Sequence, residues 1–127
     1  MAKVDEGVDA IASVEQFKEA MARWASGVTV VAVREGGEVR GMTASAFASV
    51  SADPPLLLVN VMKRARILPM LLRQERFVLN ILREEQQAAS RHFSGWPSLE
   101  SDPFPRVGDP VLPGSLASFI CTLWNVF

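Results

Sequence analysis

The chain has 127 residues, of which 49% are hydrophobic and 21% charged, and its formal net charge at pH 7 is −1. This length fits one domain with a sizeable core, and the near-neutral charge gives no reason to expect nucleic acid or an anionic membrane as a partner. The single cysteine, Cys121, excludes an internal disulfide and a metal site built from several thiolates. Apolar runs are far shorter than a membrane span and the N-terminus has no apolar signal core, so the cytoplasm is the expected location.

The first element expected along the chain is a helix. Residues 1–12 are expected to form a disordered N-terminus. Ser13 and Gln16 fit a capping box, in which each side chain bonds the other residue's backbone N–H. Apolar residues then recur at helical spacing and predict an amphipathic helix over residues 14–25. These apolar residues are Phe17, Ala20, Met21 and Trp24.

Strands are expected next. β-Branched residues over 28–34 predict a strand, and a tight turn at Gly36-Gly37 leads into its hairpin partner over 38–42. Asp53-Pro54-Pro55 turns the chain and blocks a helix. Residues 56–62 run apolar without alternation, which predicts a strand with both faces buried.

Helix and strand patterns alternate through the following segment. A short helix is expected to end at about Gln74, with Pro69 tolerated in its first turn. Residues 76–82 read as a strand, and the polar residues 84–93 predict a helix that stops at Gly95.

The C-terminal part combines an irregular segment with a final strand. Residues 94–114 hold five prolines and three glycines, which predicts an excursion without regular structure. Residues 115–127 resume as a strand, and the sequence stops there without a turn or cap. A last strand without a neighbour exposes unpaired backbone groups, so we expect either a second subunit at this edge or a natural protein that continues. The fragment interpretation is favoured.

The stretch over residues 41–51 is small, rich in hydroxyls and nearly uncharged. Small residues let a backbone approach a ligand closely, and hydroxyls with free N–H groups satisfy a polar ligand without adding charge. The stretch therefore favours a flat, polar ligand. A small-residue strand packed against a helix explains the same residues equally well.

Two asparagines lie in strand-like runs, and a buried carboxamide needs hydrogen-bond partners. For Asn80 we expect a satisfied core residue. For Asn60, which precedes a basic segment, ligand contact and a core role stay equally open. That segment holds Lys63, Arg64 and Arg66, which suit a phosphate beside a helix N-terminus, although such runs are commonly solvated loops.

Side chains for acid–base or nucleophilic catalysis are scarce. His92 is the only histidine, which disfavours a histidine-based metal site, and its position at a helix end suits a favourable charge. Cys121 has apolar neighbours and is expected to pack rather than react. No catalytic side chain is assigned, and a bound cofactor is expected to carry the chemistry.

Several segments in register resemble the flavin reductase-like family, which includes the reductase components of two-component flavin monooxygenases. The resemblance runs from about residue 15 to the end of the chain. It rests on residues 17–31, 41–55, 77–82, 91–95 and 110–117.

The resemblance implies a fold and a reaction. The fold is mainly β with flanking helices, an FMN-binding split β-barrel that lacks its C-terminal strands here, in one domain over residues 1–127. The implied reaction is hydride transfer from NADH or NADPH to N5 of FMN or FAD. The implied partners are a second copy in a homodimer and a flavin-dependent monooxygenase that receives reduced flavin.

The resemblance also implies binding residues. Thr43, Ala44 and Ser45 would line the ribityl and phosphate side of the flavin. Ser49, Val50 and Ser51 would present backbone groups to the isoalloxazine edge, with Asn60 near the ring. The phosphate would be approached by Lys63, Arg64, Ala65 and Arg66.

Two departures from the family pattern bear on function. Many relatives have Ser and Thr where this chain has Ala65 and Ile67, so we expect looser flavin binding that relies on Arg64 and Arg66. Such binding suits an enzyme that uses flavin as a substrate. The Gly-Asp-His segment that relatives carry farther on, on the nicotinamide side, is absent from this sequence.

Two other functions stay open at this point. A flavin-binding protein of the same fold that stores flavin or oxidises another donor is the main alternative. A dimeric scaffold that binds no flavin is the second.

Overall fold

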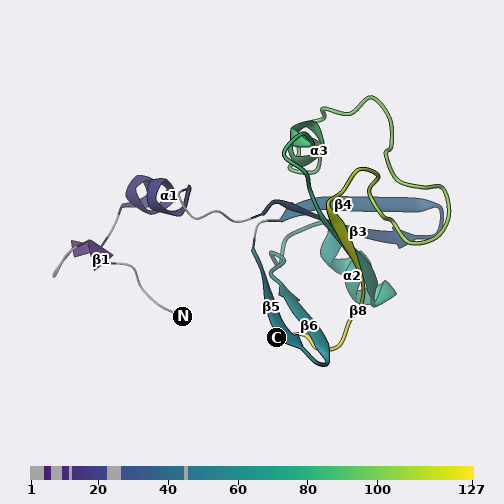
Figure 1. Cartoon of the computed structure of the whole chain (residues 1–127), viewed down its shortest axis with the longest axis horizontal. Helices are drawn as coiled ribbons and strands as arrows, with labels where there is room; N and C mark the ends of the chain where they lie inside the picture. The colour runs from purple at the N-terminus through teal and green to yellow at the C-terminus, as the bar shows by residue number, and fades with distance from the viewer. Residues whose placement is uncertain (1–4, 7–9, 12, 23–26, 45) are drawn as a thin grey trace.

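The computed structural model describes residues 5–6, 10–11, 13–22, 27–44 and 46–127 (Figure 1). Near the N-terminus, β1 (Asp5–Glu6) pairs with β2 (Ala10–Ile11). The other positions of the N-terminal segment, for which disorder is predicted, lie outside the described residues. The helix α1 (Val14–Ala22) begins at the predicted capping box: the Ser13 N–H donates to Gln16 Oε1 at 2.8 Å, and the Gln16 N–H donates to Ser13 Oγ at 3.2 Å. The rest of that predicted helix, residues 23–25, lies outside the described residues.

A four-stranded antiparallel sheet forms the centre of the fold, with the order β4-β3-β7-β8. Its strands are β3 (Thr29–Glu35), β4 (Glu38–Ala44), β7 (Arg76–Ile81) and β8 (Ala117–Thr122). The predicted hairpin is confirmed: β3 pairs with β4 around a turn in which Gly36 has a φ of +61°, a conformation that favours glycine.

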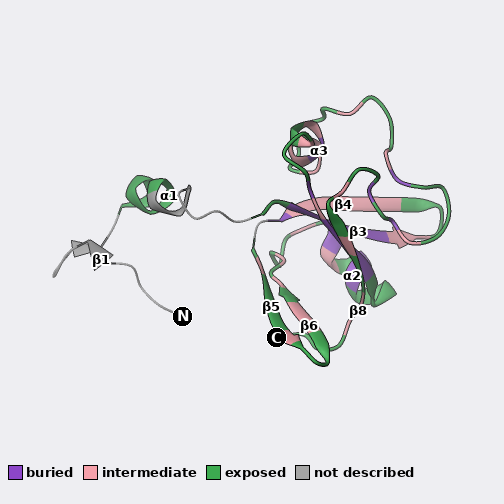
Figure 2. Ribbon diagram, viewed as in Figure 1, coloured by how far each residue is buried: buried purple, intermediate pink, exposed green. Residues whose placement is uncertain are grey.

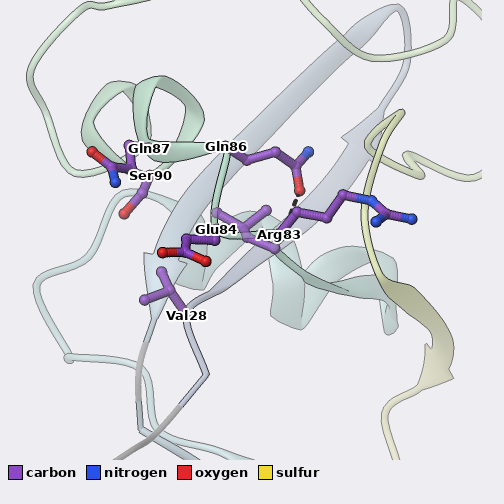
Figure 3. A pocket seen from close by; sticks show the side chains of 7 residues that line it. Val28, Arg83, Glu84, Gln86, Gln87 and Ser90 are labelled. Atoms are coloured by element: carbon purple, nitrogen blue, oxygen red, sulfur yellow. Dashed lines mark hydrogen bonds between the residues drawn. The ribbon is translucent and has the colours of Figure 1, made fainter.

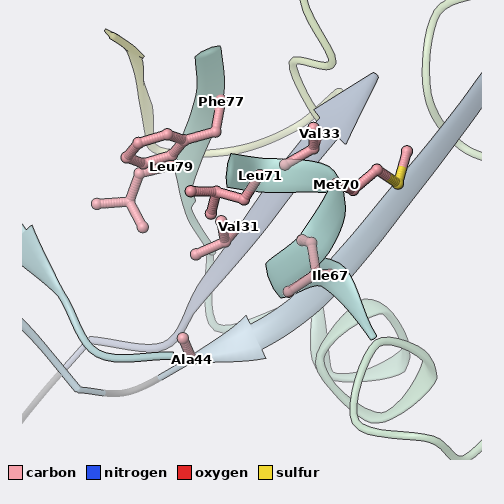
Figure 4. Close-up of a cluster of buried hydrophobic side chains, with 8 residues drawn as sticks. All are labelled: Val31, Val33, Ala44, Ile67, Met70, Leu71, Phe77 and Leu79. Atoms are coloured by element: carbon pink, nitrogen blue, oxygen red, sulfur yellow. The ribbon is translucent and has the colours of Figure 1, made fainter. Parts of the chain in front are cut away.

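Both faces of the central strands are covered. Val31 and Val33 of β3 point into one apolar cluster, and Val30 and Ala32 point into another on the opposite face. The first, cluster 1, is closed by the helix α2 (Ile67–Gln74), with Pro69 in its first turn as expected (Figure 4). Cluster 1 consists of Val31, Val33, Ala44, Ile67, Met70, Leu71, Phe77 and Leu79.

The opposite face is covered by α3 (Gln87–His92) and by residues 94–114. Cluster 2 on this face consists of Val30, Ala32, Leu82, Ala89, Phe104 and Leu112. Residues 94–114 contain no helix or strand, as expected, and their backbone is fixed by side chains of the sheet. The Arg34 guanidinium donates to the carbonyl oxygens of Gly108 (2.7 Å), Arg106 (3.1 Å) and Pro105. The excursion is thus a cover for the sheet.

The strands β5 (Phe47–Ala52) and β6 (Pro55–Val59) form a separate antiparallel hairpin. The prediction of a doubly buried strand over residues 56–62 was wrong. The observed strand ends at Val59, and Figure 2 shows β5 and β6 without a fully buried residue. Only one side of this hairpin meets cluster 1, through Leu57 and Val59, so Leu58 on the other side is exposed.

The bounds of two further elements differ from the predictions. The helix over 84–93 begins only at Gln87, because the Arg83 N–H donates to Gln86 Oε1 and the Gln86 N–H donates to the Arg83 carbonyl in a turn. The last strand ends at Thr122 rather than continuing to 127, because its partner β7 begins at Arg76, directly opposite Thr122. In the described part of the chain, no helix is long and apolar enough to cross a membrane.

Ion pairs fasten the helix and the excursion to the sheet. Arg73 of α2 holds Glu35 with two bonds of 2.8 Å, and these bonds, with one from Gln74, lower the pKa of the Glu35 carboxyl to about 2. Arg76 of β7 holds Asp109 in the same two-bonded way at 2.8 Å, which lowers the pKa of the Asp109 carboxyl.

Asn80 is a satisfied core residue, as predicted. Its Nδ2 donates to the carbonyls of Val30 (3.2 Å) and Pro110 (3.3 Å). Its Oδ1 accepts from the Leu112 N–H (2.9 Å) and the Ser118 hydroxyl (2.7 Å). One fully buried carboxamide therefore connects β3, β8 and the excursion to β7.

Replacing Asn80 is expected to destabilise the fold strongly. Asn80→Ala removes a partner from three buried backbone groups and from the part-buried Ser118 hydroxyl, and it opens a cavity, so the free energy of unfolding should fall by about 3 kcal/mol or more. The matched control is Asn60→Ala, because that side chain is exposed. The control should change stability by less than about 0.5 kcal/mol in urea denaturation. Equal losses in the two variants would contradict the assignment.

Candidate functional site

The predicted ligand-binding stretch lies where β4 ends and the β5–β6 hairpin begins. Gly41 to Ala44 are the last residues of β4, and Ser45 lies outside the described residues. Ala44 is buried in cluster 1, and its carbonyl accepts the Thr29 hydroxyl. Close packing against neighbouring elements is therefore part of the reason for the small residues here.

Thr43 is engaged by the end of α3. Its backbone N–H donates to the Phe93 carbonyl at 3.0 Å, and its hydroxyl donates to the Ser90 carbonyl at 2.6 Å. Both hydrogen-bond donors of Thr43 are thus occupied within the protein, and the lone pairs of its hydroxyl oxygen are what it offers to a ligand.

The loop over residues 60–66 is brought to the same end of β4. The Asn60 N–H donates to the Ala46 carbonyl at 3.0 Å, and Ala65 packs against cluster 1, which also contains Ala44. The expectation that Asn60 occupies a buried strand was wrong: it follows the end of β6 and is exposed. An exposed Asn60 has no need of a core partner, because water satisfies its carboxamide.

Three cations of this loop are exposed. Lys63, Arg64 and Arg66 form no ion pair with the described residues. The helix α2 starts directly after Arg66, and its N-terminus has no side-chain cap. Exposed cations beside a helix N-terminus that no side chain caps suit an anion such as a phosphate.

The third predicted group lies farther along the hairpin. Ser49 pairs with Leu57 and Ser51 pairs with Leu56, so Val50 between them is the extra residue of a β-bulge. Val50 is 60% exposed. The structure thus brings Ala44 and the 60–66 loop to cluster 1, whereas the Thr43 side chain faces α3 on the opposite face of β4. Residues 49–51 lie on the adjoining hairpin, where the bulge interrupts regular pairing.

Two hollows flank α3, and none of the predicted binding residues that the structure describes lines either. The first encloses about 190 Å³, and Figure 3 shows side chains of its wall, with Glu84 and Val28 close to each other. It is lined by Val28, Leu82, Arg83, Glu84, Gln86, Gln87 and Ser90. The second encloses about 350 Å³ and is lined by Val39, His92, Phe93, Leu99, Glu100, Ser101, Asp102, Pro103 and Phe104. The sequence signal for the first is the polar run over residues 84–87, at the start of the helix predicted over 84–93.

Neither His92 nor Cys121 is arranged for catalysis. His92 Nδ1 accepts the backbone N–H groups of Ser98 (3.1 Å) and Leu99 (3.2 Å), so the ring fixes the start of the excursion as well as standing at the end of α3. Cys121 packs against cluster 1, as predicted, and burial raises the pKa of its thiol. This environment disfavours the reactive thiolate.

Comparison with known proteins identifies the family. Residues 21–127 match the family described as "Flavin reductase like domain", and the chain belongs to it. It is 57% identical over 83 residues to the reductase component of 4-hydroxyphenylacetate 3-monooxygenase from Thermus thermophilus, covering 65% of this chain and 56% of that protein. It is 39% identical over 113 residues to an NADH-dependent flavin reductase from Rhodococcus, covering 84% of this chain and 64% of that one.

The fold agrees with that family. The solved flavin reductase PheA2 superposes with a TM-score of 0.79 and 35% sequence identity, over 90% of this chain and 76% of that structure. A mainly β fold with a few helices is therefore confirmed. The chain spans less than two thirds of the length of the two curated relatives described above.

Proposed function

We propose that this protein binds FMN or FAD beside the end of β4 and reduces it with NADH or NADPH, releasing reduced flavin to a partner monooxygenase. The observation that carries the proposal is the meeting of small β4 residues with an unpaired basic loop, in a chain that belongs to the flavin reductase-like family. The two relatives described above support it, since one is named as a flavin reductase and the other as the reductase component of a monooxygenase.

The residues of the basic loop fit a flavin phosphate because they are positively charged and exposed. Lys63, Arg64 and Arg66 supply three cations that the described residues leave unpaired, and Ala65 lies between them with no bulky side chain. Other cations of the sheet and of α2 already have partners: Arg34 and Arg76 bond the excursion, and Arg73 of α2 bonds Glu35 of β3. Arg40 of β4 pairs with Glu38.

The remaining binding groups are mainly backbone. Ala44 and Ser45 are proposed to let the ribityl chain approach β4, with Thr43 offering its hydroxyl oxygen as an acceptor. Ser49, Val50 and Ser51 are proposed to present backbone groups to the isoalloxazine edge, because a bulge leaves the extra residue outside the ladder. Asn60 is proposed to lie near the ring. When bound, the flavin supplies the hydride acceptor, so the chain's own task is to bind and orient it.

The wider assignment follows from the same family. We propose that residues 1–127 form a single flavin reductase-like domain in which the sheet and the β5–β6 hairpin build a split β-barrel. We also propose a cytoplasmic location, in keeping with the lone cysteine, which forms no disulfide within this chain.

The reductase proposal predicts flavin-dependent oxidation of NADH or NADPH. With FMN or FAD added, the decrease in absorbance of the reduced nicotinamide should depend saturably on the flavin concentration. Saturable quenching of flavin fluorescence without nicotinamide oxidation would instead identify a flavin store or an oxidase of another donor. Absence of both signals in the folded protein would favour a scaffold that binds no flavin.

The basic loop is expected to bind the phosphate of the flavin and no other part of it. Arg64→Ser should weaken FMN binding by about tenfold, the loss of one charge-assisted hydrogen bond, and should leave riboflavin binding unchanged. The control is Arg106→Ser, because Arg106 is exposed and its side chain forms no ion pair with the described residues. Fluorescence titration of the wild type and of both variants with FMN and with riboflavin measures the six affinities. An equal loss for FMN and riboflavin would show that Arg64 does not recognise the phosphate.

A homodimer is proposed because apolar side chains are exposed at the free edge of the sheet. Phe119 and Ile120 of β8 are exposed, as is Trp124 after it. Light scattering should give twice the 13.9 kDa mass of one chain, and Ile120→Lys should shift the mass toward the monomer. Val107→Lys, in an exposed position of the excursion, should leave the mass unchanged. A monomeric wild-type protein would refute this assembly.

A further inference from the structure

The C-terminal end of α3 is held on β4 by contacts that converge on two residues of the predicted binding stretch. The Thr43 N–H donates to the Phe93 carbonyl at 3.0 Å, and the Thr43 hydroxyl donates to the Ser90 carbonyl at 2.6 Å. These two carbonyls belong to the last turn of α3, where a helix has carbonyl groups without an internal partner. Thr43 thus gives both of its donors to the end of the helix, where the Ser90 carbonyl also accepts the Ser94 hydroxyl at 2.7 Å.

Gly41 provides the space that this arrangement requires. A Cβ atom at Gly41 would lie 2.7 Å from Cδ1 and 2.9 Å from Cε1 of Phe93, closer than such atoms approach. The Phe93 ring stands 5.4 Å from the Phe104 ring and 4.9 Å from the His92 ring, measured between centroids. The ring can approach the backbone of β4 this closely because residue 41 is glycine.

The helix α3 depends on these contacts for its position. It has six residues and no side-chain cap at its N-terminus, and a helix this short is unstable by itself. Among its residues only Ala89 is buried. Both hollows that flank α3 are lined partly by α3 or the residue after it, Ser90 in the first and Phe93 in the second. The same two residues bond Thr43, so the position of α3 sets what lies against this part of β4.

We infer that Gly41 and Thr43 are positioning residues for the proposed flavin site, acting through Phe93 and Ser90. They hold α3 against the end of β4, and Thr43 donates no hydrogen bond to the flavin phosphate. The predicted effect of these residues on flavin binding rests on the proposed function. The attachment of α3 itself follows from the contacts within the chain.

The inference predicts a loss of flavin affinity that is the same whether or not the flavin carries a phosphate. Thr43→Val removes the bond to Ser90, and Gly41→Ala displaces the Phe93 ring. Each should weaken FMN and riboflavin binding by the same factor, about fivefold or more. Thr43→Ser keeps the hydroxyl and should bind both flavins as the wild type does. Gly37→Ala is the control in the same hairpin, because nothing lies within 4 Å of a Cβ there.

A double substitution tests the route through Phe93. Phe93→Leu removes the ring atoms that a Cβ at residue 41 would meet. Adding Gly41→Ala to Phe93→Leu should therefore change flavin affinity by less than about twofold, whereas adding Thr43→Val should still weaken it. A loss for FMN with no loss for riboflavin in Thr43→Val would overturn the inference, since it would place the Thr43 hydroxyl on the phosphate.

Hydrogen exchange separates this inference from the proposed function. In Gly41→Ala, the amides of Ser90 and Phe93, which bond within α3, should exchange at least several-fold faster than in the wild type, with or without flavin. Unchanged exchange in both Gly41→Ala and Thr43→Val would overturn the inference even if flavin binds. Faster exchange in a protein that binds no flavin would uphold the attachment of α3 and refute the flavin site.

Discussion

The hydrogen bonds of the buried Asn80 carboxamide are the interaction on which the rest of the structure depends. One amide group satisfies groups of β3, β8 and two points of the excursion, so these parts are fixed relative to β7 together. The stabilisation concerns the partners as much as Asn80, since three of the four are buried backbone groups that would lose a hydrogen bond without this side chain. A segment with five prolines has no ladder of its own, and this carboxamide anchors its end.

The anchored excursion determines the geometry beside the proposed site. Its Phe104 and Leu112 close cluster 2, and the Phe104 ring supports Phe93 after α3. Phe93 in turn rests on Gly41 and accepts the Thr43 N–H. A continuous series of contacts therefore leads from the sheet centre to the end of β4. The site gains rigidity from segments that have little regular structure of their own.

Local sequence signals predicted the elements that depend on local chemistry. The Gly36-Gly37 turn, the capping box at Ser13 and the helix ending at Gln74 need only neighbouring residues, and they were predicted correctly. The exposure of Asn60 and the bulge at Val50 were not predicted, because strand pairing across the chain decides both. The hollows beside α3 escaped prediction for the same reason: their walls join strand ends, a helix and the excursion, and no single stretch of sequence contains them.

The chemistry of the basic loop connects the core to the way a flavin would be held. Ile67 is 2% exposed within cluster 1, and Ala65 packs against the same cluster, so both positions serve the fold. A hydroxyl at position 67 would be buried at the expense of apolar packing. The proposed phosphate contacts therefore fall to exposed cations at 63, 64 and 66, whose attraction is screened by salt. Contacts of this kind give fast exchange rather than permanent retention, as required of a protein that treats flavin as a diffusing substrate.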